Sequence, residues 1–293
     1  MKPQVGLVTV LFNSADVLPD FFESLKNQKF TDYWLFIIDN SLDNISFLKS
    51  QELIAGTGMK NVTLIKNEQN VGVAKANNQG IELSLNIGCD YVLLLNNDIE
   101  FKDGDLLGNM VTLAESRSEK IIVPKIYFHD SGLIWCAGGT IHKWRGSTQH
   151  RGEGDADAGQ YDRAEYTDYA PTCFMLVHAS VFEKIGMMDE RYFVYYDDAD
   201  FVLRCNQKNV RTYYWPGGKV WHKVSSSTGG DMTPFSIYYG SRNRVYFTKK
   251  NFPAHVALVS LSFFLLTRFL KFKLFEAKLR SKLISGISDG FKM

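Results

Sequence analysis

Asn96, Asn97 and Asp98 follow an apolar run, residues 91–95, that has the length and composition of a buried strand. The backbone leaves a sheet at such a point, and open α/β sheets bind ligands at the carboxyl ends of their strands. A carboxylate and an amide two residues apart can hold a hard divalent cation against a diphosphate. Asn and Asp also end strands as turn formers, so this stretch alone leaves a cation site and an ordinary turn both open.

A second concentration of carboxylates, Asp197, Asp198 and Asp200, precedes an apolar pattern of helical spacing. Clustered carboxylates raise one another's pKa, which suits a general base that works near neutral pH. Acidic residues also stabilise the first turn of a helix, and both roles can hold at once. Asp200 is the candidate for a purely structural role, paired with Arg204.

The elements that would position these residues alternate between strand and helix over the first hundred residues. Apolar runs predict buried parallel strands at residues 5–11, 34–38, 62–65 and 91–95. Helices are predicted between them at about 17–25 and 73–87, with Ser14 as the N-cap of the first and Gly88 ending the second. This alternation predicts βαβ units and a mainly parallel sheet.

Beyond about residue 121 the pattern is less regular. The polar, Gly-rich stretch 152–159 is typical of a loop, either a mobile flap or an inert surface loop, and the second is the favoured interpretation. A strand is predicted at 211–215, before a turn at Pro216-Gly217-Gly218. Thr233 and Pro234 then open a helix that runs to about Lys250.

The composition is that of a folded soluble protein large enough for a full α/β core. The chain has 293 residues, 45% hydrophobic and 22% charged. A formal net charge of +1 gives no support to a nucleic-acid partner. Its four cysteines show no pairing or metal-ligand spacing and indicate reduced thiols in a cytosolic protein. Residues 1–4 lack a signal-peptide pattern, so we expect a substrate reachable from the cytoplasm.

Several short motifs together resemble one enzyme family, over roughly residues 4–245. The matching stretches are 9–13, 38–41, 70–74, 77–80, 96–98, 137–139, 186–193, 196–200, 220–222 and 239–243. Their order and spacing are similar to those of family 2, GT-A-type inverting glycosyltransferases. The resemblance is strongest to the rhamnosyltransferase and galactofuranosyltransferase-like members that build bacterial polysaccharides.

The resemblance implies a site for a sugar donor and a divalent cation. Asn96 and Asp98 occupy the position of the family's DxD motif, with Asp98 the more direct metal ligand, and His222 matches a position that supplies a third ligand. The implied cofactor is Mn²⁺ or Mg²⁺, and a nitrogen ligand favours Mn²⁺ somewhat. The nucleotide-binding residues implied by the match are Thr9, Phe12, Asn13, Asp39, Asn70, Gly72, Asn78, Asn97 and Arg242.

By the same alignment Asp198 is the general base, and Asp197, which replaces the usual Glu of the motif, orients the acceptor or Asp198 itself. Asp39 resembles a carboxylate that accepts the imide N–H of uracil or thymine. As alternatives, Asp39 could cap the next helix, residues 70–72 could form only a turn, and Arg242 could be a solvated surface side chain.

The tail beyond residue 250 combines an apolar segment with a basic one. Residues 254–267 are apolar nearly all round but too short to span a bilayer comfortably. Six cations follow against one acid, namely Arg268, Lys271, Lys273, Lys278, Arg280 and Lys282 against Glu276. This pattern suits a helix lying in the interface of an anionic membrane, and membrane contact is the favoured interpretation. A dimer-forming helix, and so a homo-oligomer, stays open, as does a helix packed on the catalytic domain.

The sequence therefore predicts an α/β protein with a GT-A-type, Rossmann-like, mainly parallel sheet flanked by helices and a C-terminal helical appendage. Residues 1–250 are the expected catalytic domain, divided into a nucleotide-binding half (1–100) and an acceptor and catalytic half (101–250), and 251–293 form the tail. The resemblance implies metal-dependent, inverting transfer of rhamnose, galactofuranose or a hexose. The donor would be a dTDP- or UDP-sugar.

The expected acceptor is a lipid-linked intermediate of bacterial surface polysaccharide synthesis, at the inner face of the cell membrane. Two other functions stay open. A sugar-nucleotide nucleotidyltransferase shares the nucleotide-binding sheet, but its Gly-rich basic loop is missing from residues 13–16. A non-catalytic sugar-nucleotide-binding protein would keep the fold without needing Asp198.

Overall fold

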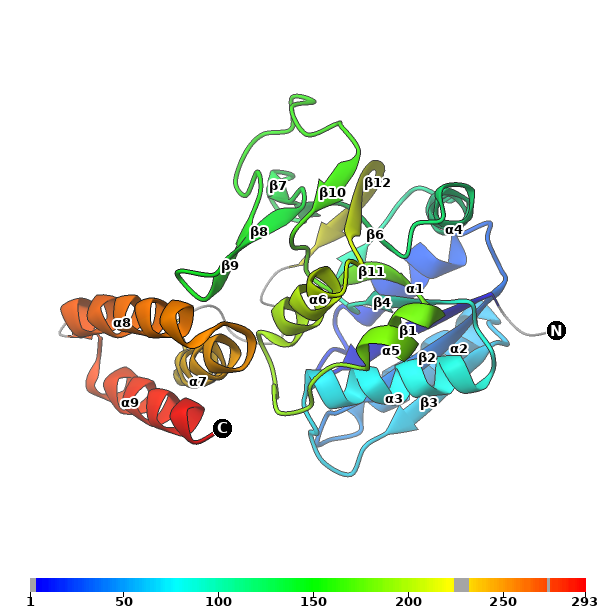
Figure 1. Cartoon of the computed structure of the whole chain (residues 1–293). Helices are drawn as coiled ribbons and strands as arrows, with labels where there is room; N and C mark the ends of the chain where they lie inside the picture. Colours follow the sequence, from blue (N-terminus) through cyan, green and yellow to red (C-terminus); the bar gives the residue numbers. More distant parts are fainter. Residues whose placement is uncertain (1–3, 224–231, 273–274) are drawn as a thin grey trace.

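The structure, a computed structural model, describes residues 4–223, 232–272 and 275–293, in which helices cover both faces of a large sheet (Figure 1). The strands are β1 Val5–Leu11, β2 Tyr33–Asp39, β3 Val62–Lys66, β4 Tyr91–Leu95, β5 Ile99–Glu100, β6 Ile121–Phe128, β7 Ile134–Cys136, β8 Gly139–His142, β9 Ser147–His150, β10 Glu165–Thr167, β11 Phe174–His178 and β12 Thr212–His222. The helices are α1 Leu18–Lys26, α2 Ile45–Thr57, α3 Val73–Asn86, α4 Leu106–Arg117, α5 Ala179–Ile185, α6 Asp197–Gln207, α7 Pro234–Asn251, α8 Ala254–Lys271 and α9 Ala277–Lys292.

The main path of the sheet runs β10-β12-β6-β11-β4-β1-β2-β3, and β5 and β7 pair with β12 and β6. The block β3-β2-β1-β4 is parallel throughout, as the strand–helix alternation predicts. β11 then runs antiparallel between β4 and β6, and β12 lies parallel to β6. The predicted α/β class is confirmed, with antiparallel strands entering in the second half of the chain.

Alternate residues of the central strands point to opposite faces of the sheet and so build two cores. Leu7 and Leu93 face the core that α1 and α4 cover, whereas Val8 and Leu94 face the core that α3 and α6 cover. All four side chains are buried. Burial on both faces fixes the register of these strands, and therefore fixes where their carboxyl ends and the loops after them lie.

Two local predictions are wrong. Ser14 is not the N-cap of α1, which begins at Leu18 with Val17 at the N-cap and no side-chain cap. The Ser14 hydroxyl instead accepts a hydrogen bond from the Phe12 backbone N–H at 3.0 Å. Pro19 in the first turn lacks an N–H and so reduces the need for a cap.

The turn expected at residues 216–218 is also wrong, because β12 continues through it from Thr212 to His222. The register against β6 shifts between Trp215 and Lys219, so the extra residues form a bulge within one long strand. The bulge matters for the site, because the strand that it interrupts is the one that ends at His222.

The C-terminal helices form a separate layer beside the sheet (Figure 1). α7 begins as predicted, with Thr233 and Ser236 in a capping box. α9 packs tightly on α7, since a Cβ at Gly286 would collide with the Tyr238 carbonyl. None of the helices in the described ranges is both long and apolar enough to cross a membrane. The tail cation Lys273 lies outside the described residues.

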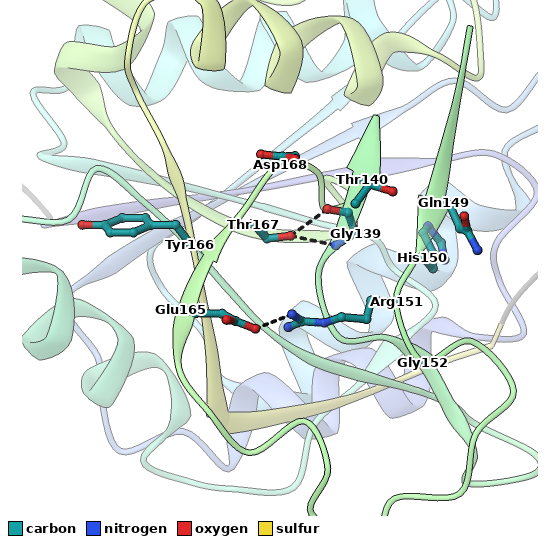
Figure 2. Close-up of a pocket in the computed structure, with 10 residues that line it drawn as sticks. All are labelled: Gly139, Thr140, Gln149, His150, Arg151, Gly152, Glu165, Tyr166, Thr167 and Asp168. Carbon is teal, nitrogen blue, oxygen red and sulfur yellow. Dashed lines mark hydrogen bonds and ion pairs between the residues drawn. The ribbon is translucent and has the colours of Figure 1, made fainter. Parts of the chain in front are cut away.

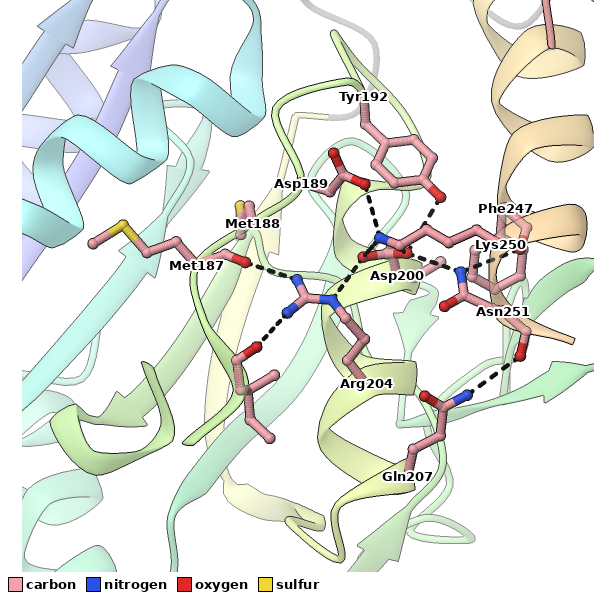
Figure 3. Close-up of polar contacts among 12 residues, drawn as sticks. Met187, Met188, Asp189, Tyr192, Asp200, Arg204, Gln207, Phe247, Lys250 and Asn251 are labelled. Atoms are coloured by element: carbon pink, nitrogen blue, oxygen red, sulfur yellow. Dashed lines mark hydrogen bonds and ion pairs between the residues drawn. The ribbon is translucent and has the colours of Figure 1, made fainter. Parts of the chain in front are cut away.

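A buried ion network joins α6 to α7 (Figure 3). Asp200 is fully buried and accepts hydrogen bonds from Arg204 at 2.8 Å and from Lys250 at 2.7 and 2.8 Å. Lys250 also binds Asp189 at 2.8 Å, in the segment before α6. The predicted pairing of Asp200 with Arg204 is confirmed, and it is part of a larger network that fixes the N-terminal half of α6.

We expect Asp200→Ala to lower the free energy of unfolding by about 3–5 kcal/mol, because removing this buried carboxylate takes the counter-charge from Arg204 and part of it from Lys250, both of which are mostly buried. Urea unfolding monitored by circular dichroism measures this change. Asp105→Ala is the control, since its ion pair with Lys29 is exposed and the residue, although it is the N-cap of α4, should contribute no more than about 1 kcal/mol. Equal effects of the two substitutions would contradict the role given to Asp200.

Candidate active site

The loop after β4 brings Asp98 beside the end of β12. β5 pairs antiparallel with β12, which sets Ile99 opposite His222. The Lys223 backbone N–H donates to the Asp98 carbonyl at 2.9 Å and closes the same ladder. As a result, Asp98 Oδ1 lies 3.1 Å from His222 Nε2, with both side chains mostly buried. Two residues more than 120 positions apart in sequence are therefore neighbours.

A row of aromatic rings leads from this pair to the acidic motif. The edge of Trp135 meets His222, with ring centroids 4.5 Å apart, and meets His150 at the same separation. His150 stacks on Tyr169 at 5.8 Å. The Tyr169 hydroxyl donates to Asp198 Oδ2 at 2.5 Å. Asp98, His222 and Asp198 are thus brought into one contiguous cluster.

Cys173 lies near both carboxylates of this cluster. Its backbone carbonyl accepts from the Asn96 N–H at 2.8 Å, at the end of β4. Burial raises the pKa of the Cys173 thiol well above its ordinary value, and the charges of Cys136, Asp98 and Asp198 raise it further. Both acids act on this one thiol, which agrees with their lying on the same edge of the sheet.

Asp197 is buried and Asp198 is half-buried at the start of α6, and the pKa values of both are raised. Burial is the main cause for Asp197, whose pKa rises to about 7, and the charge of Asp198 adds to it. Burial also raises the pKa of Asp198, against hydrogen bonds from the Tyr169 hydroxyl and the Ala199 N–H. A carboxylate with a raised pKa is a stronger proton acceptor than an exposed one. The N-terminal position of both residues on α6 helps to hold the charged form.

The turn that enters α6 is strained and is held by α7. Tyr195 and Tyr196 are consecutive residues with φ of 65° and 68°, a region that costs energy for side chains with a Cβ. Asn243 is fully buried, and its amide donates to the carbonyls of Val194 at 2.7 Å and Tyr195 at 2.9 Å. Asn243 therefore positions the backbone from which the acidic motif begins.

Asp98 and His222 form a donor pair that fits a divalent cation. Two atoms that bind one cation at roughly 2.1 Å and at right angles lie about 3 Å apart, which matches the separation of this carboxylate oxygen and imidazole nitrogen. Asn96 is exposed, and no contact places its amide beside them. The described part of the chain has no cluster of three or more His, Cys, Asp or Glu side chains suited to a metal.

The predicted nucleotide residues of the first three strands lie at the same carboxyl edge. Asp39 ends β2 and is fully buried; its Oδ1 accepts from the Ser41 N–H at 2.8 Å and its Oδ2 lies 3.3 Å from Lys66 Nζ. The alternative that Asp39 caps α2 is wrong, because Asn44 is the N-cap. Asn13 is exposed, and its N–H donates to Ser41 Oγ at 2.9 Å.

Other predicted nucleotide residues differ in how far they are exposed. Thr9 is fully buried within β1, whereas Phe12 is partly exposed just after it. Asn97 is buried, and its amide donates to the Val10 carbonyl, which ties the β4 loop to β1. Phe12 is thus the best placed of these three to contact a ligand.

Gly72 lets another group lie close to its backbone, and in this structure that group is Phe193 rather than a ligand. Its φ is +87°, and a Cβ there would lie 2.6 Å from the Phe193 carbonyl. Asn70 Oδ1 accepts from the Gly72 N–H at 3.0 Å, which makes residues 70–72 a side-chain-stabilised turn. This turn fixes the start of α3 against the segment that precedes the acidic motif.

Asn78 and Arg242 contact that same segment rather than the edge formed by β1 and β2. The Asn78 amide donates to the Met188 carbonyl at 2.9 Å and accepts from the Met188 N–H at 3.0 Å. Arg242 donates to the Arg191 carbonyl at 2.8 Å and to Asn243. In this structure both side chains therefore support the loop over residues 187–195.

A polar cavity of about 430 Å³ adjoins the cluster on the side of β8, β9 and β10 (Figure 2). His150 belongs both to its wall and to the aromatic row. Burial lowers the pKa of His150 to about 4, so this imidazole is neutral at pH 7. Arg151 and Glu165 pair across the cavity floor, as Figure 2 shows.

The Gly-rich stretch 152–159 is anchored to the sheet. Lys125 of β6 is fully buried, and its ammonium binds Asp157 at 2.9 Å and Asp162 at 2.5 Å. Tyr127 also donates to Asp157 at 2.5 Å. These contacts agree with the interpretation as a surface loop rather than a mobile flap.

Sequence reasoning missed Tyr169, His150 and the positioning contacts of Asn243. Tyr169 and His150 stand in an irregular stretch whose fold could not be predicted from periodicity. Asn243 is the last residue of the final stretch that resembles the family, and this was the only sign in the sequence that could have pointed to its role. Its role depends on a contact with a loop almost fifty residues earlier.

Residues 7–186, well over half of the chain, match the sequence model of the family described as Glycosyl transferase family 2. The chain belongs to this family. The family is one of glycosyltransferases, the class that the resemblance of the short motifs implies.

Two named relatives share modest sequence identity with this chain. The chain is 26% identical to the low-salt glycan biosynthesis hexosyltransferase Agl10 of Haloferax volcanii over 71% of its own length, and spans 64% of that relative. It is 24% identical to the dTDP-rhamnosyl transferase RfbF of Shigella flexneri, over 88% of this chain and 83% of RfbF.

The fold of the family member agrees with a solved enzyme. A mannosyltransferase from Pyrobaculum calidifontis, solved with GDP-Man and Mn²⁺, superposes with a TM-score of 0.61 over 99% of this chain and 88% of that chain. The sequence identity is 11%, so the comparison concerns the fold alone. It confirms the predicted GT-A-type architecture.

We expect Asp197→Asn to change the pH dependence of stability. The unfolded carboxyl titrates near its ordinary pKa of about 4, whereas the folded one titrates near 7. The contribution of protonated Asp197 is therefore fully present below pH 4 and is lost as the pH rises through 7. The variant should match wild type at pH 4 and exceed it by roughly 2–4 kcal/mol at pH 8. Urea unfolding at both pH values measures this difference, and an offset independent of pH would contradict it.

Proposed function

We propose that this family member transfers rhamnose, galactofuranose or a hexose from a dTDP- or UDP-sugar to a lipid-linked acceptor of bacterial surface polysaccharide, with inversion. The observation that carries the proposal is the contiguous cluster from Asp98 and His222 through the aromatic row to Asp198. In this cluster, a pair of side chains suited to a divalent cation and a carboxylate suited to accept a proton lie at one edge of the sheet. The similarity to RfbF, whose name gives dTDP-rhamnose, supports rhamnose as the first sugar to test.

In this proposal the chain is divided as the sequence predicts. Residues 1–100 hold the nucleotide, 101–250 hold the acceptor and the base, and 251–293 form the tail. The carboxyl edge of β1, β2 and β4 receives the base and ribose, near Phe12, Asn13 and Asp39. Lys66, which lies against Asp39, supplies a cation at that edge.

Asp198 acts as the general base. The acceptor hydroxyl attacks the anomeric carbon from the face opposite the diphosphate, a new C–O bond forms, and the bond to the diphosphate breaks. The hydroxyl proton passes to Asp198, which is anionic above its raised pKa. Tyr169 holds Oδ2 of Asp198 at 2.5 Å, so the proton acceptor keeps one orientation, and neutral Asp197 would limit charge repulsion beside it.

Asp98 and His222 would hold Mn²⁺ or Mg²⁺, with the donor diphosphate completing the ligand set. A divalent cation there would offset the negative charge that develops on the leaving diphosphate. The buried surroundings of this pair strengthen its interaction with charge. Asn96 would then act through the loop rather than as a primary ligand.

The protein would work at the inner face of the cell membrane. α8 is a helix, as the apolar pattern predicts, and it leaves large apolar side chains exposed, among them Phe269 and Leu270. A tail that contacts lipid would bring the active site to a lipid-linked acceptor.

Asp198→Asn should lower kcat by roughly 10²–10⁴ while leaving donor binding intact, because it removes only the proton acceptor. Product formation is measured with purified protein, dTDP-rhamnose or UDP-sugars and a lipid-linked acceptor extract. Asp130→Asn, a fully exposed carboxylate, is the control. Wild-type activity in the Asp198 variant would rule out this base.

Thermal-shift screening identifies the donor and tests the metal pair together. A matching nucleotide sugar with Mn²⁺ should raise Tm, since saturation at 100 Kd adds about 2.7 kcal/mol. His222→Gln should abolish the part of the shift that depends on Mn²⁺ but keep the part due to nucleotide alone. A metal-dependent shift that survives this substitution would remove His222 from the site.

A further inference from the structure

The tip of the β8–β9 hairpin lies against α8 and adds to its exposed face. A Cβ at Gly146 would meet the hydroxyls of Thr248 and Ser260, so the tip packs closely on α7 and α8. The Arg145 guanidinium lies over the ring of Phe263, 5.8 Å from its centroid. Trp144 is 49% exposed, near His255 of α8. The tip and α8 thus form one surface from two segments more than a hundred residues apart.

This surface is apolar at its centre. Exposed side chains recur along α8 at helical spacing, from Leu258 through Leu266 to Phe269, which is 76% exposed. The opposite face of the helix is buried through Val256 and Phe264. The described neighbours of α8 leave its outer face uncovered. Single exposed hydrophobic residues are ordinary on a protein surface, whereas a contiguous row of them marks an interaction surface.

Several cations lie at the hairpin tip and near α8. Lys143 and Arg145 stand at the hairpin tip, Arg268 lies over Phe264, and Arg280 lies over Phe272. Positive and negative charges are also unevenly distributed along the sequence. Residues 254–293 hold seven Lys and Arg against two acids, whereas the remaining residues hold 26 against 30. The positive charge is thus concentrated in the C-terminal segment that contains α8.

We propose that the tip of the hairpin, residues 143–146, and the outer face of α8 together dock on an anionic phospholipid bilayer, with Trp144 at the level of the headgroups. An indole with one apolar and one polar edge suits that level, and an apolar row with cations near it matches anionic lipid. The hairpin becomes a second lipid contact besides the tail. This inference rests on the proposed membrane contact of the tail and extends it.

The hairpin also connects that surface to the active site. β9 ends at His150, in the aromatic row, and the Gly146 carbonyl accepts from the Tyr196 hydroxyl at 3.1 Å. Tyr196 is the N-cap of α6, directly before the acidic motif. Lipid bound at the tip would therefore lie at one end of a rigid strand pair whose other end lines the catalytic cluster.

The test uses the full chain and vesicles of phosphatidylglycerol with phosphatidylcholine, against phosphatidylcholine alone, in a sedimentation assay. Wild type should bind the anionic vesicles at least five-fold more, and 0.5 M NaCl should reduce that binding. Trp144→Ser and Phe269→Ser should each lower it several-fold. Leu42→Ser, which removes a 77% exposed side chain on the nucleotide half, is the matched control and should bind as wild type.

A second measurement addresses the hairpin alone. Brominated phosphatidylglycerol should quench the tryptophan fluorescence of wild type, and Trp144→Phe should lose most of that quenching while still sedimenting with vesicles. If Phe269→Ser releases the protein but both Trp144 substitutions change neither readout, the hairpin inference fails and the tail contact stands. If no variant changes binding, or if light scattering shows that α8 instead joins two copies, both proposals fail.

Discussion

The pairing of β5 with the last residues of β12 is the contact on which the candidate site depends. β5 has only two residues, yet its register sets Ile99 opposite His222 and so puts Asp98 within 3.1 Å of the imidazole. Such a short strand has little stability of its own. It persists because β12 is held along most of its length by β6, and because Ile99 and Val220 are buried in the same core.

The acidic motif depends on a different kind of support. Asp197, which is buried, and Asp198, which is half-buried, are adjacent carboxylates with raised pKa values, and both destabilise the folded state at neutral pH. The third acid of the motif has the opposite environment, since Asp200 lies among Arg204, Lys250 and Asn251. Acids within one helical turn thus differ in role because cations reach only one of them. Asp200 and its ion pairs fix the helix, whereas Asp197 and Asp198 keep raised pKa values.

The elements that have a short, regular pattern of apolar residues were predicted best from the sequence. Continuous apolar runs gave β1 and β4 with nearly correct bounds, since burial on both faces leaves no choice of residue type. The family motifs gave Asp98, His222 and Asp198, which the structure joins in one cluster. A local pattern could not give the bulge in β12, because Pro216 followed by two glycines has the composition of a turn wherever it stands. Here the pairing with β6 overrides that preference.

Contacts between distant segments were also beyond sequence reasoning. Tyr169 reaches Asp198 only because β10 pairs with β12 and the chain then turns beneath α6, and no motif marks that path. The contacts that α7 makes with distant segments were also beyond sequence reasoning. Asn243 holds the strained turn before α6, Lys250 binds Asp189 and Asp200, and the hairpin tip that lies beside α8 packs on Thr248. One helix therefore braces the acidic motif and the exposed apolar face at once. A force applied to that face by a bound surface would reach the acidic motif through the packed side chains of α7.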